Sequence, residues 1–544
     1  MDTDNLDVAA THKAIIASLV RTTRAAALLV PDNVILHKAQ DPQFASDLGI
    51  ASSELLQVAN AVLKFLAGPE SRARPFAHAA DVAENWSSAV EVMEQALDKA
   101  DMALDQFYNR NAGSESESAA TAAGTVRVAG SSGSTVRVMT SASIPCPQQA
   151  FPRGEVDNDA RTPWVPKIKS KPHARVPLVA PVVGPETPVD TAFPHPYAYE
   201  LEHLEWPDHL FEVPAPQEHQ GSDETGAVGV RPGPLESTPY EFVDTLPALQ
   251  RMLAEMRGAH EVAVDLEHHN YRTYLGLTCL MQVSTRTHDW IVDTLALRMH
   301  CHLLNEVFAD PEVVKVLHGA ESDVIWLQRD LGLYLVNLFD TFHATRALAF
   351  PRNSLAYLLK RYCDVNANKQ YQLADWRMRP LPADMERYAR EDTHYLLYIY
   401  DQLRAELAAN SPQQQPPLGS SSSTKTRAQL IEVVLRKSVT TASQVFTKER
   451  YDAETGSGAL GWFNMMLKNP RPMTRRASAA LKALHAWRDA LAREEDESVH
   501  YVTPNHALFA LAEKMPQDPQ AVVAHVHPSP PMLKLHAGEV ARIL

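Results

Sequence analysis

Four short apolar runs between residues 240 and 408 restrict the fold of this part of the chain more than any other feature of the sequence. They read VAVDLE, TCLMQVST, DWIVD and VVKVLHG, and helical patterns follow them. Runs of this length that are bounded by turn residues are typical of buried strands. Because strands that alternate with helices pack as a sheet covered by helices, we expect an α/β domain here.

The first run contains two carboxylates. Side chains alternate between the two faces of a strand, so Asp265 and Glu267 would lie side by side on one face. Val262, Val264 and Leu266 would lie on the other. Two like charges this close repel one another unless a cation or water separates them. The pair alone is weak evidence, because about eight acid-x-acid pairs are expected by chance in such a chain.

Two further carboxylates fall in helical segments. In VLHGAESDVIWLQRDLG (316–332) a strand ends and a helix begins, which places Asp323 in the first turn of the helix. In ERYAREDTHYLLYIYDQ (386–402) Tyr388 and Asp392 are four residues apart and share a helix face. Each also has an ordinary explanation: the first acid compensates a helix dipole, the tyrosine is half-buried, and the last acid is solvated.

Taken together, the four carboxylates and the tyrosine resemble the active site of the DEDD 3′→5′ exonucleases, in the subgroup whose third motif is Tyr-x-x-x-Asp. They are Asp265, Glu267, Asp323, Tyr388 and Asp392. The segments that surround them, such as VDLEHHNYRTYLGLTCLMQV and NKQYQLADWRMRPLP, resemble the RNase D-like exoribonucleases associated with the nuclear exosome. The resemblance implies an RNase H-like fold with a mixed sheet.

The chemistry of this family accounts for the residue types. Four carboxylates can neutralise two divalent cations about 4 Å apart, which together clamp both sides of a phosphodiester displacement. Hard oxygen ligands suit Mg²⁺ or Mn²⁺. The resemblance implies that Asp265 bridges the two ions, that Glu267 and Asp392 complete the water-activating site, and that Asp323 supports the leaving-group ion. A phenol with a pKa near 10 is a poor base, so Tyr388 is expected to orient the attacking water.

Six further residues gain an RNA-binding interpretation from the resemblance: His268, His269, Tyr271, Trp326, Lys369 and Arg377. Rings can stack on the bases of a single-stranded 3′ end, and cationic side chains can contact phosphates. Structural explanations stay open as well. The histidines could cap the strand end, the tryptophan could belong to the core, and Arg377 could pair with Asp375.

The flanking segments resemble other parts of the same family. The expected division is an all-α partner-binding domain at 1–110, a low-complexity linker at 111–145, a proline-rich strap at 146–239, the exonuclease domain at 240–408, a linker at 409–425, an all-α HRDC domain at 426–520 and an extension at 521–544. An apolar stripe from Val90 to Leu104 fits either an internal helical hairpin or a docking face. The low-complexity linker, in which TVRV occurs twice, is expected to lack regular structure.

Composition bears on the compartment. A formal net charge of −15 argues against a protein that coats polyanions, and four scattered cysteines indicate neither a disulfide framework nor a zinc site. The acidic start MDTDNLD is unlike a signal peptide, and no apolar run is long enough to cross a bilayer. We therefore expect a soluble, intracellular protein in a reducing compartment.

The resemblance implies a metal-dependent 3′→5′ exoribonuclease that hydrolyses single-stranded RNA 3′ ends to 5′-mononucleotides with two Mg²⁺ (or Mn²⁺) ions. It implies as partners the nuclear exosome core and a small basic adaptor protein on the N-terminal domain, no membrane, and a location in the nucleus, including the nucleolus. The alternatives are a catalytically silent exosome scaffold and a DNA 3′→5′ exonuclease. The complete set of acids argues against the first, and HHNYR and QLADWRMRP favour RNA over DNA.

Overall fold

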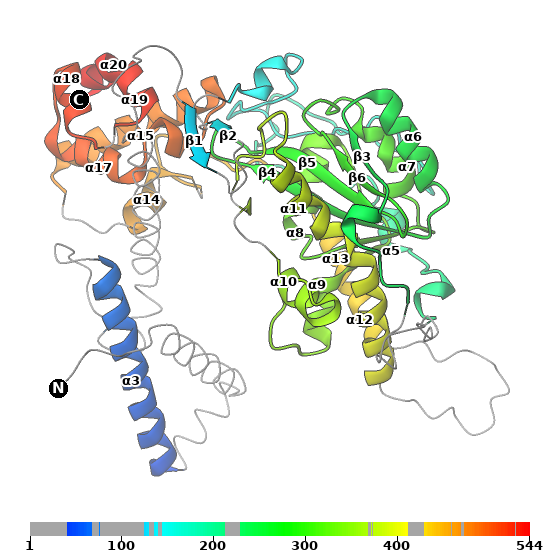
Figure 1. Cartoon of the computed structure of the whole chain (residues 1–544). Coiled ribbons are helices and arrows are strands. Elements are labelled where there is room, and N and C mark those ends of the chain that lie inside the picture. Colours follow the sequence, from blue (N-terminus) through cyan, green and yellow to red (C-terminus); the bar gives the residue numbers. More distant parts are fainter. Residues whose placement is uncertain are drawn as a thin grey trace. The chain divides into compact units, whose positions relative to one another are not determined.

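A computed structural model of the chain shows two compact units (Figure 1). One comprises Met1–Ala120 with Met466–Arg471, and the other comprises Thr121–Met465 with Pro472–Leu544. The structure describes residues 41–67, 76, 125–129, 135–139, 144–212, 229–367, 371–372, 374–411, 429–458, 460–468, 473–527 and 529–544.

The smaller unit contains helix α3 (Pro42–Ala67). The carboxylate of Asp41 accepts the backbone N–H of Gln43 at 2.9 Å and so satisfies one free donor at the start of the helix. The helix ends before Gly68 and Pro69, which the sequence predicts as a stop. Four of its apolar side chains are 43–57% exposed: Ile50, Leu55, Val58 and Val62. The predicted stripe at 90–104 lies outside the described residues.

The larger unit is organised around a six-stranded mixed sheet in the order β3-β6-β5-β4-β7-β8. Strand β5 is antiparallel to β4 and β6, and the other neighbouring pairs are parallel. The strands are β3 (Tyr240–Val243), β4 (Glu261–His269), β5 (Leu277–Ser284), β6 (Asp289–Val292), β7 (Val314–Leu317) and β8 (Leu338–Asp340). The four apolar runs therefore form β4 to β7, and the predicted α/β class with a mixed sheet is confirmed.

The two TVRV copies also form strands, contrary to the expected lack of regular structure. Strand β1 (Thr125–Ala129) pairs antiparallel with β2 (Thr135–Met139). Each copy places β-branched residues at neighbouring positions, and such residues favour extended backbone.

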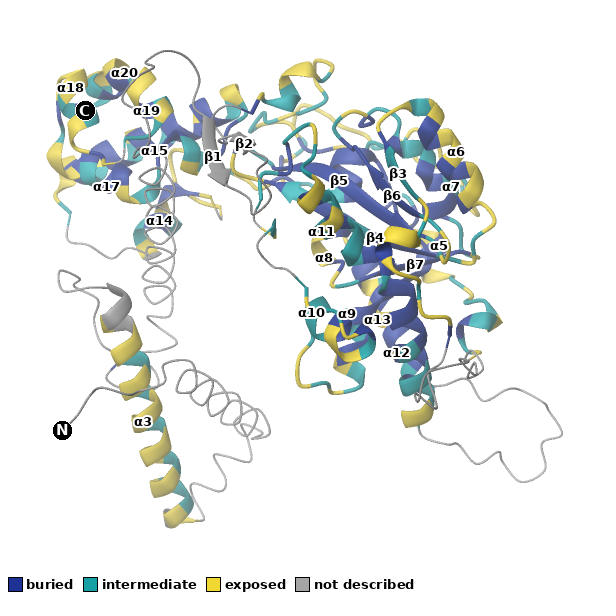
Figure 2. Ribbon diagram, in the orientation of Figure 1, coloured by how far each residue is buried: buried dark blue, intermediate teal, exposed yellow. Residues whose placement is uncertain are grey.

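Helices cover both faces of the sheet, which is buried between them (Figure 2). Val262, Val264 and Leu266 of β4 belong to one hydrophobic core, and Ala263 belongs to another, as the alternation of the strand requires. The helices of this part are α5 (Ala198–Glu202), α6 (Leu246–Met256), α7 (Asn305–Phe308), α8 (Glu321–Trp326), α9 (Thr341–Ala347), α10 (Leu355–Leu358), α11 (Ala383–His394), α12 (Leu396–Asn410) and α13 (Gln429–Ala442). Short 3-10 or π turns are η2 (Pro147–Ala150), η3 (Asp208–Leu210), η4 (Leu235–Ser237), η5 (Cys301–Leu304), η6 (Leu327–Leu331) and η7 (Leu359–Cys363).

The remaining helices form the C-terminal part of the chain: α14 (Trp462–Lys468), α15 (Arg475–Glu495), α16 (Val499–Val502), α17 (Asn505–Lys514), α18 (Pro519–Ala524), α19 (Pro531–Leu535) and α20 (Ala537–Ile543). Two expected boundaries differ here. Helix α13 packs on β8, α9 and α12, so it belongs with the sheet and not with the C-terminal helices. Helices α18 to α20 pack on one another and on α15 and α16, so residues 521–544 complete the helical domain.

The strap connects these parts. In residues 144–196, all of which the structure describes, the only regular element is the short turn η2. A buried ion pair within the strap joins Lys171 to Glu200 at 2.7 Å. Lys448, which follows α13, binds the strap through an ion pair with Asp157 at 2.7 Å. Every helix within the described residues is too short or too polar to span a bilayer.

Candidate functional site

The four predicted carboxylates meet beside β4. Asp265 and Glu267 of that strand and Asp392 of α11 offer oxygen atoms that all lie within 4.8 Å of one another. Asp323, in the first turn of α8, lies close enough to raise the pKa of Glu267 and to have its own pKa raised by Asp265. Side chains that are 127 positions apart in the sequence (Asp265 and Asp392) thus form one cluster.

Strand β4 and the turn before α8 position three of the four acids. The alternation of β4 places two acids on one face, and a β-bulge follows between Glu267 and His268. The carboxylate of Asp340 accepts the backbone N–H groups of Gly319 at 2.8 Å and Ala320 at 3.0 Å. These bonds fix the turn between β7 and α8 and therefore the start of the helix that carries Asp323.

Burial and mutual repulsion both disfavour charge in the cluster. Burial raises the pKa of Asp265 to about 7. The pKa of Glu267 is raised well above its usual value by burial and then by Asp265 and Asp392. The pKa values of Asp323 and Asp392 are raised by burial and then by Asp265. Cations would relieve this repulsion, and an all-carboxylate donor set suits a hard divalent ion such as Mg²⁺ or Mn²⁺.

Tyr388 lies beside the cluster. Its ring stacks on Trp376, with ring centroids 6.0 Å apart. Burial, followed by Asp392 and Glu267, raises the pKa of the phenol far above its ordinary value. The phenol therefore stays protonated at neutral pH and can donate a hydrogen bond.

Two of the predicted RNA-binding residues contact one another. The ring of His268 stacks on Trp326 at a centroid distance of 4.0 Å and an angle of 3°. Its Nε2 accepts a hydrogen bond from Arg329 Nη2 at 3.2 Å. Gly276 has a φ of +90° and borders the same imidazole, where a Cβ atom would collide with Nε2.

For two others the structure favours the structural explanation. His269 is buried and accepts the backbone N–H of Arg272 at 3.0 Å, so it caps the end of the strand. The guanidinium of Arg377 is buried and donates to both oxygens of Asp375, at 2.9 and 2.6 Å. Tyr271 is 49% exposed and meets the ring of Tyr501 edge-on. Lys369 lies outside the described residues.

Sequence reasoning missed two buried polar residues of the sheet, Gln282 and Asp289. Gln282 of β5 is buried, lies opposite Asp265 in the β4–β5 register and donates from Nε2 to Glu267 Oε1 at 3.2 Å. Asp289 of β6 is buried and receives hydrogen bonds from Arg390 and His394 of α11. The only signal in the sequence is a polar residue within an apolar strand pattern.

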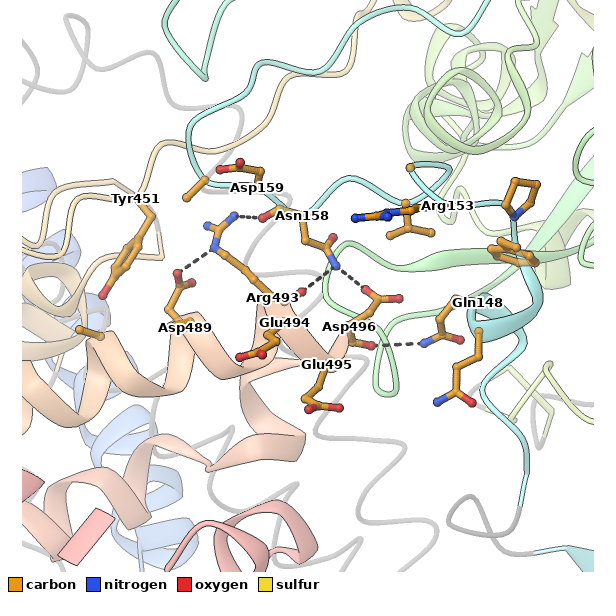
Figure 3. Close-up of a pocket in the computed structure, with 18 of the residues that line it drawn as sticks. Gln148, Arg153, Asn158, Asp159, Tyr451, Asp489, Arg493, Glu494, Glu495 and Asp496 are labelled. Atoms are coloured by element: carbon orange, nitrogen blue, oxygen red, sulfur yellow. Dashed lines mark hydrogen bonds and ion pairs between the residues drawn. The ribbon is translucent and has the colours of Figure 1, made fainter. Parts of the chain in front are cut away.

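A cavity of about 860 Å³ lies elsewhere in the larger unit, between the strap and α15 (Figure 3). Arg493 spans one side of it, donating to Asp489 at 2.8 Å and to the carbonyl of Asn158 at 2.8 Å. The described residues that line the cavity include none of the five predicted catalytic residues. The cavity therefore belongs to the junction between strap and helical domain and not to the carboxylate cluster.

Three domain families match the chain. A 3'-5' exonuclease domain matches residues 240–408, an HRDC domain residues 477–544, and a NUC016 domain residues 20–109. The chain is similar to the exosome complex exonuclease RRP6 of Saccharomyces cerevisiae, with 35% identity over 530 residues that cover 96% of this chain and 66% of that protein.

Exosome complex component 10 of Rattus norvegicus is 41% identical over 433 residues, which cover 75% of this chain and 45% of that protein. The chain therefore spans about half the length of the mammalian relatives it matches. Among solved structures, the catalytic core of RRP6 from Trypanosoma brucei superposes with a TM-score of 0.61 at 32% identity, covering 74% of this chain and 98% of that one.

Proposed function

The chain belongs to the family of the exosome complex exonuclease RRP6 and exosome complex component 10, and from this membership we propose that it is a metal-dependent 3′→5′ exoribonuclease. It would hydrolyse single-stranded RNA from the 3′ end and release 5′-mononucleotides. The observation that carries the proposal is the cluster of Asp265, Glu267 and Asp392, whose oxygens lie within 4.8 Å of one another. Asp323 and Tyr388 interact with the same cluster.

The carboxylates would hold two divalent ions, Mg²⁺ or Mn²⁺. Asp265, Glu267 and Asp392 would hold one ion. Asp323, whose pKa is raised by burial and then by Asp265, would help to hold the other. Bound ions of this kind supply a more acidic water and neutralise charge on the leaving oxygen. The raised pKa values of the four acids fit this assignment, because they describe a site whose charges need cations.

The chain's own residues would orient the substrate. The protonated phenol of Tyr388 can donate a hydrogen bond to the attacking water or to the scissile phosphate. The stacked rings of His268 and Trp326 offer a flat surface of the kind on which a terminal base stacks. We assign Tyr271 to RNA contact at the edge of the site because its ring is half exposed. Lys369 remains a predicted phosphate contact.

We propose the exosome core and a small basic adaptor protein as partners, and the nucleus, including the nucleolus, as the location. The relatives named as exosome components support the first partner. The exposed apolar residues of α3, within the segment that matches the NUC016 domain, support a protein partner on the smaller unit.

The test is the digestion of a single-stranded RNA labelled at its 5′ end, in the presence of Mg²⁺. We expect a ladder that shortens from the 3′ end, and its loss both with a chelator and in Asp265→Asn. If the folded, unaltered chain leaves RNA intact, the catalytically silent scaffold is correct. If it degrades the matching DNA strand at least as fast, the chain is a DNA exonuclease.

A further inference from the structure

Helix α11 uses two sides for two different contacts. Tyr388 and Asp392 face the carboxylates of β4. Arg390 and His394 each lie two residues further along the helix, a rotation of about 200°. Their side chains therefore leave the opposite side of the helix, where they meet Asp289 at the start of β6.

Asp289 collects hydrogen bonds from both the helix and the sheet. Its Oδ2 accepts from His394 Nδ1 at 2.9 Å and from Arg390 Nη2 at 3.0 Å. Its Oδ1 accepts from the hydroxyl of Ser284 at 2.8 Å, and that hydroxyl lies 2.8 Å from the hydroxyl of Thr393. Two residues of the last turn and a half of α11 thus bind one carboxylate directly, and a third, Thr393, reaches it through Ser284; the Asp289 residue is 2% exposed.

The His394 ring is held from both nitrogens. Nε2 faces the carbonyl of Gly233 at 2.9 Å, and Nδ1 faces the Asp289 carboxylate. Both ring nitrogens therefore have a hydrogen-bond partner. Contacts at both nitrogens consequently fix the location of the His394 ring and the orientation of its plane.

The register of the sheet places this contact beside the carboxylate cluster. Asp289 pairs with Ser284 of β5, which pairs with Ala263 of β4. Asp265 and its partner Gln282 form the row two residues along. The two rows lie about 7 Å apart and present their side chains on the same face. Asp289 is therefore near the cluster, yet two strands away from the acids that form it.

We propose that Asp289 is a positioning residue that holds α11 at the rotation and depth at which Asp392 and Tyr388 reach the acids of β4. The proposal rests on the proposed function of the carboxylate cluster. It predicts that the loss of this one charge weakens both metal binding and RNA turnover, although Asp289 is not itself one of the proposed metal ligands.

The experiment measures Mn²⁺ binding to the full chain by calorimetry, without RNA, and RNA turnover separately. Asp289→Asn keeps the size of the side chain but removes the negative charge that faces Arg390 and His394. We expect Mn²⁺ affinity to fall about 10- to 100-fold, as is usual when a residue that orients metal ligands is changed. The Mn²⁺ concentration for half-maximal turnover should rise by the same factor.

The matched control is Asp401→Asn. Asp401 of α12 is also 2% exposed and also binds two cationic side chains, Arg286 at 2.6 Å and Arg404 at 3.0 Å, but its helix carries none of the five site residues. Asp401→Asn should lower the melting temperature about as much as Asp289→Asn does, and it should leave the Mn²⁺ affinity unchanged. Equal Mn²⁺ affinities in the two variants would overturn the proposal. If Asp289→Asn does not fold, His394→Gln replaces it, with a smaller loss of affinity expected and an unchanged affinity overturning the proposal.

The two proposals fail in different ways. A chain that binds Mn²⁺ normally, loses affinity in Asp289→Asn and yet degrades no RNA would overturn the exonuclease proposal and support the positioning role. If the unaltered chain degrades RNA and Asp289→Asn binds Mn²⁺ as tightly as the unaltered chain, the exonuclease proposal is supported and the positioning role is overturned. An unaltered chain that binds no Mn²⁺ would overturn both.

Discussion

At the scale of single residues, the phenol of Tyr388 has a role that its pKa dictates. Burial and the neighbouring carboxylates raise that pKa, so the phenol stays protonated at neutral pH and can donate a hydrogen bond in the proposed reaction. Tyr388→Phe should lower kcat by about 10²–10³-fold, the usual effect of removing one donor to the reacting groups, and should leave Mn²⁺ affinity unchanged. Single-turnover RNA digestion measures the first quantity and calorimetry the second.

A second tyrosine provides the control for that variant. Tyr362 donates from its phenol to Glu406 at 2.8 Å and has no contact with the carboxylate cluster among the described bonds. Tyr362→Phe should leave kcat unchanged. A Tyr388→Phe variant with full kcat would show that the phenol is not used in the reaction.

The raised pKa of Asp265, about 7, predicts how pH changes the stabilisation of the fold by a divalent ion. In the unfolded chain an aspartate has a pKa of about 3.9. The metal-free fold therefore gains stability from this protonated group below about pH 4 and loses it as pH rises through about 7. A divalent ion replaces the proton, so the rise in melting temperature on adding Mn²⁺ should be small at pH 5 and large at pH 8. Thermal unfolding with and without Mn²⁺ checks this, and in Asp265→Asn, which lacks a ligand carboxylate, the rise on adding Mn²⁺ should be small at both pH values.

The sequence predicts that four acids and a tyrosine lie together, and the structure brings the oxygens of Asp265, Glu267 and Asp392 within 4.8 Å of one another. The sequence does not predict the buried polar residues Gln282 and Asp289. Strand alternation places Asp265 beside Glu267, and helical spacing places Tyr388 beside Asp392. Both patterns are local. The bonds of Gln282 and Asp289 depend on which strands are neighbours, and the order β3-β6-β5-β4 follows from packing of the whole sheet.

At the scale of elements, the turn between β4 and β5 depends on a glycine. Gly276 has a φ of +90°, and an added Cβ would collide with His268, the ring that stacks on Trp326. Gly276→Ala should lower the free energy of unfolding by about 2–5 kcal/mol, the sum of backbone strain and overpacking. Chemical denaturation followed by tryptophan fluorescence measures it.

Gly154 in the strap separates the two contributions. Its φ is +86°, and nothing lies within 4 Å of an added Cβ. Gly154→Ala should therefore cost only the backbone strain, about 1–2 kcal/mol. Equal losses in the two variants would mean that contact with His268 does not constrain the turn.

Element assignment also shows a limit of sequence patterns. The apolar face of α13 buries Ile431, Val434 and Leu435 against the sheet, although a proline- and serine-rich segment separates this helix from α12. Periodicity predicts that such a helix has an apolar face. It does not indicate which of two neighbouring domains that face packs on.

At the scale of the molecule, the larger unit contains a junction where the β4–β5 turn, the strap and the HRDC helices meet. Arg272 pairs with Glu497 through three hydrogen bonds of 2.5–3.0 Å and lies 3.9 Å from the ring centroid of Tyr501. Tyr274 donates to Asp489 at 2.7 Å, and Gln148 donates to the carbonyl of Arg272 at 2.8 Å. Polar contacts therefore hold the exonuclease and HRDC domains together.

Glu497→Gln should weaken this junction. Breaking one side of a buried ion pair costs about 3–5 kcal/mol, because the other charge stays buried without its partner. We expect earlier proteolytic cleavage between the two domains and a lower melting temperature. Glu432→Gln is the control, since its pair with Arg436 is largely exposed and should contribute less than about 1 kcal/mol. A Glu497→Gln protein as resistant as the control would show that the ion pair does not hold the junction.

The strap at this junction has a consequence for synthesis of the chain. Asn158 and its partner Arg493 are 335 positions apart, and Cys146 and Glu497 are 351 apart. At a translation rate of about 5–20 residues per second, the strap leaves the ribosome about 20–70 s before the α15 residues that it binds. During that interval the sheet can already fold against the strap, while the side of the strap that will receive α15 waits in contact with solvent. Ribosome-bound chains halted before residue 475 should therefore be cleaved within the strap by proteases that leave the finished protein intact.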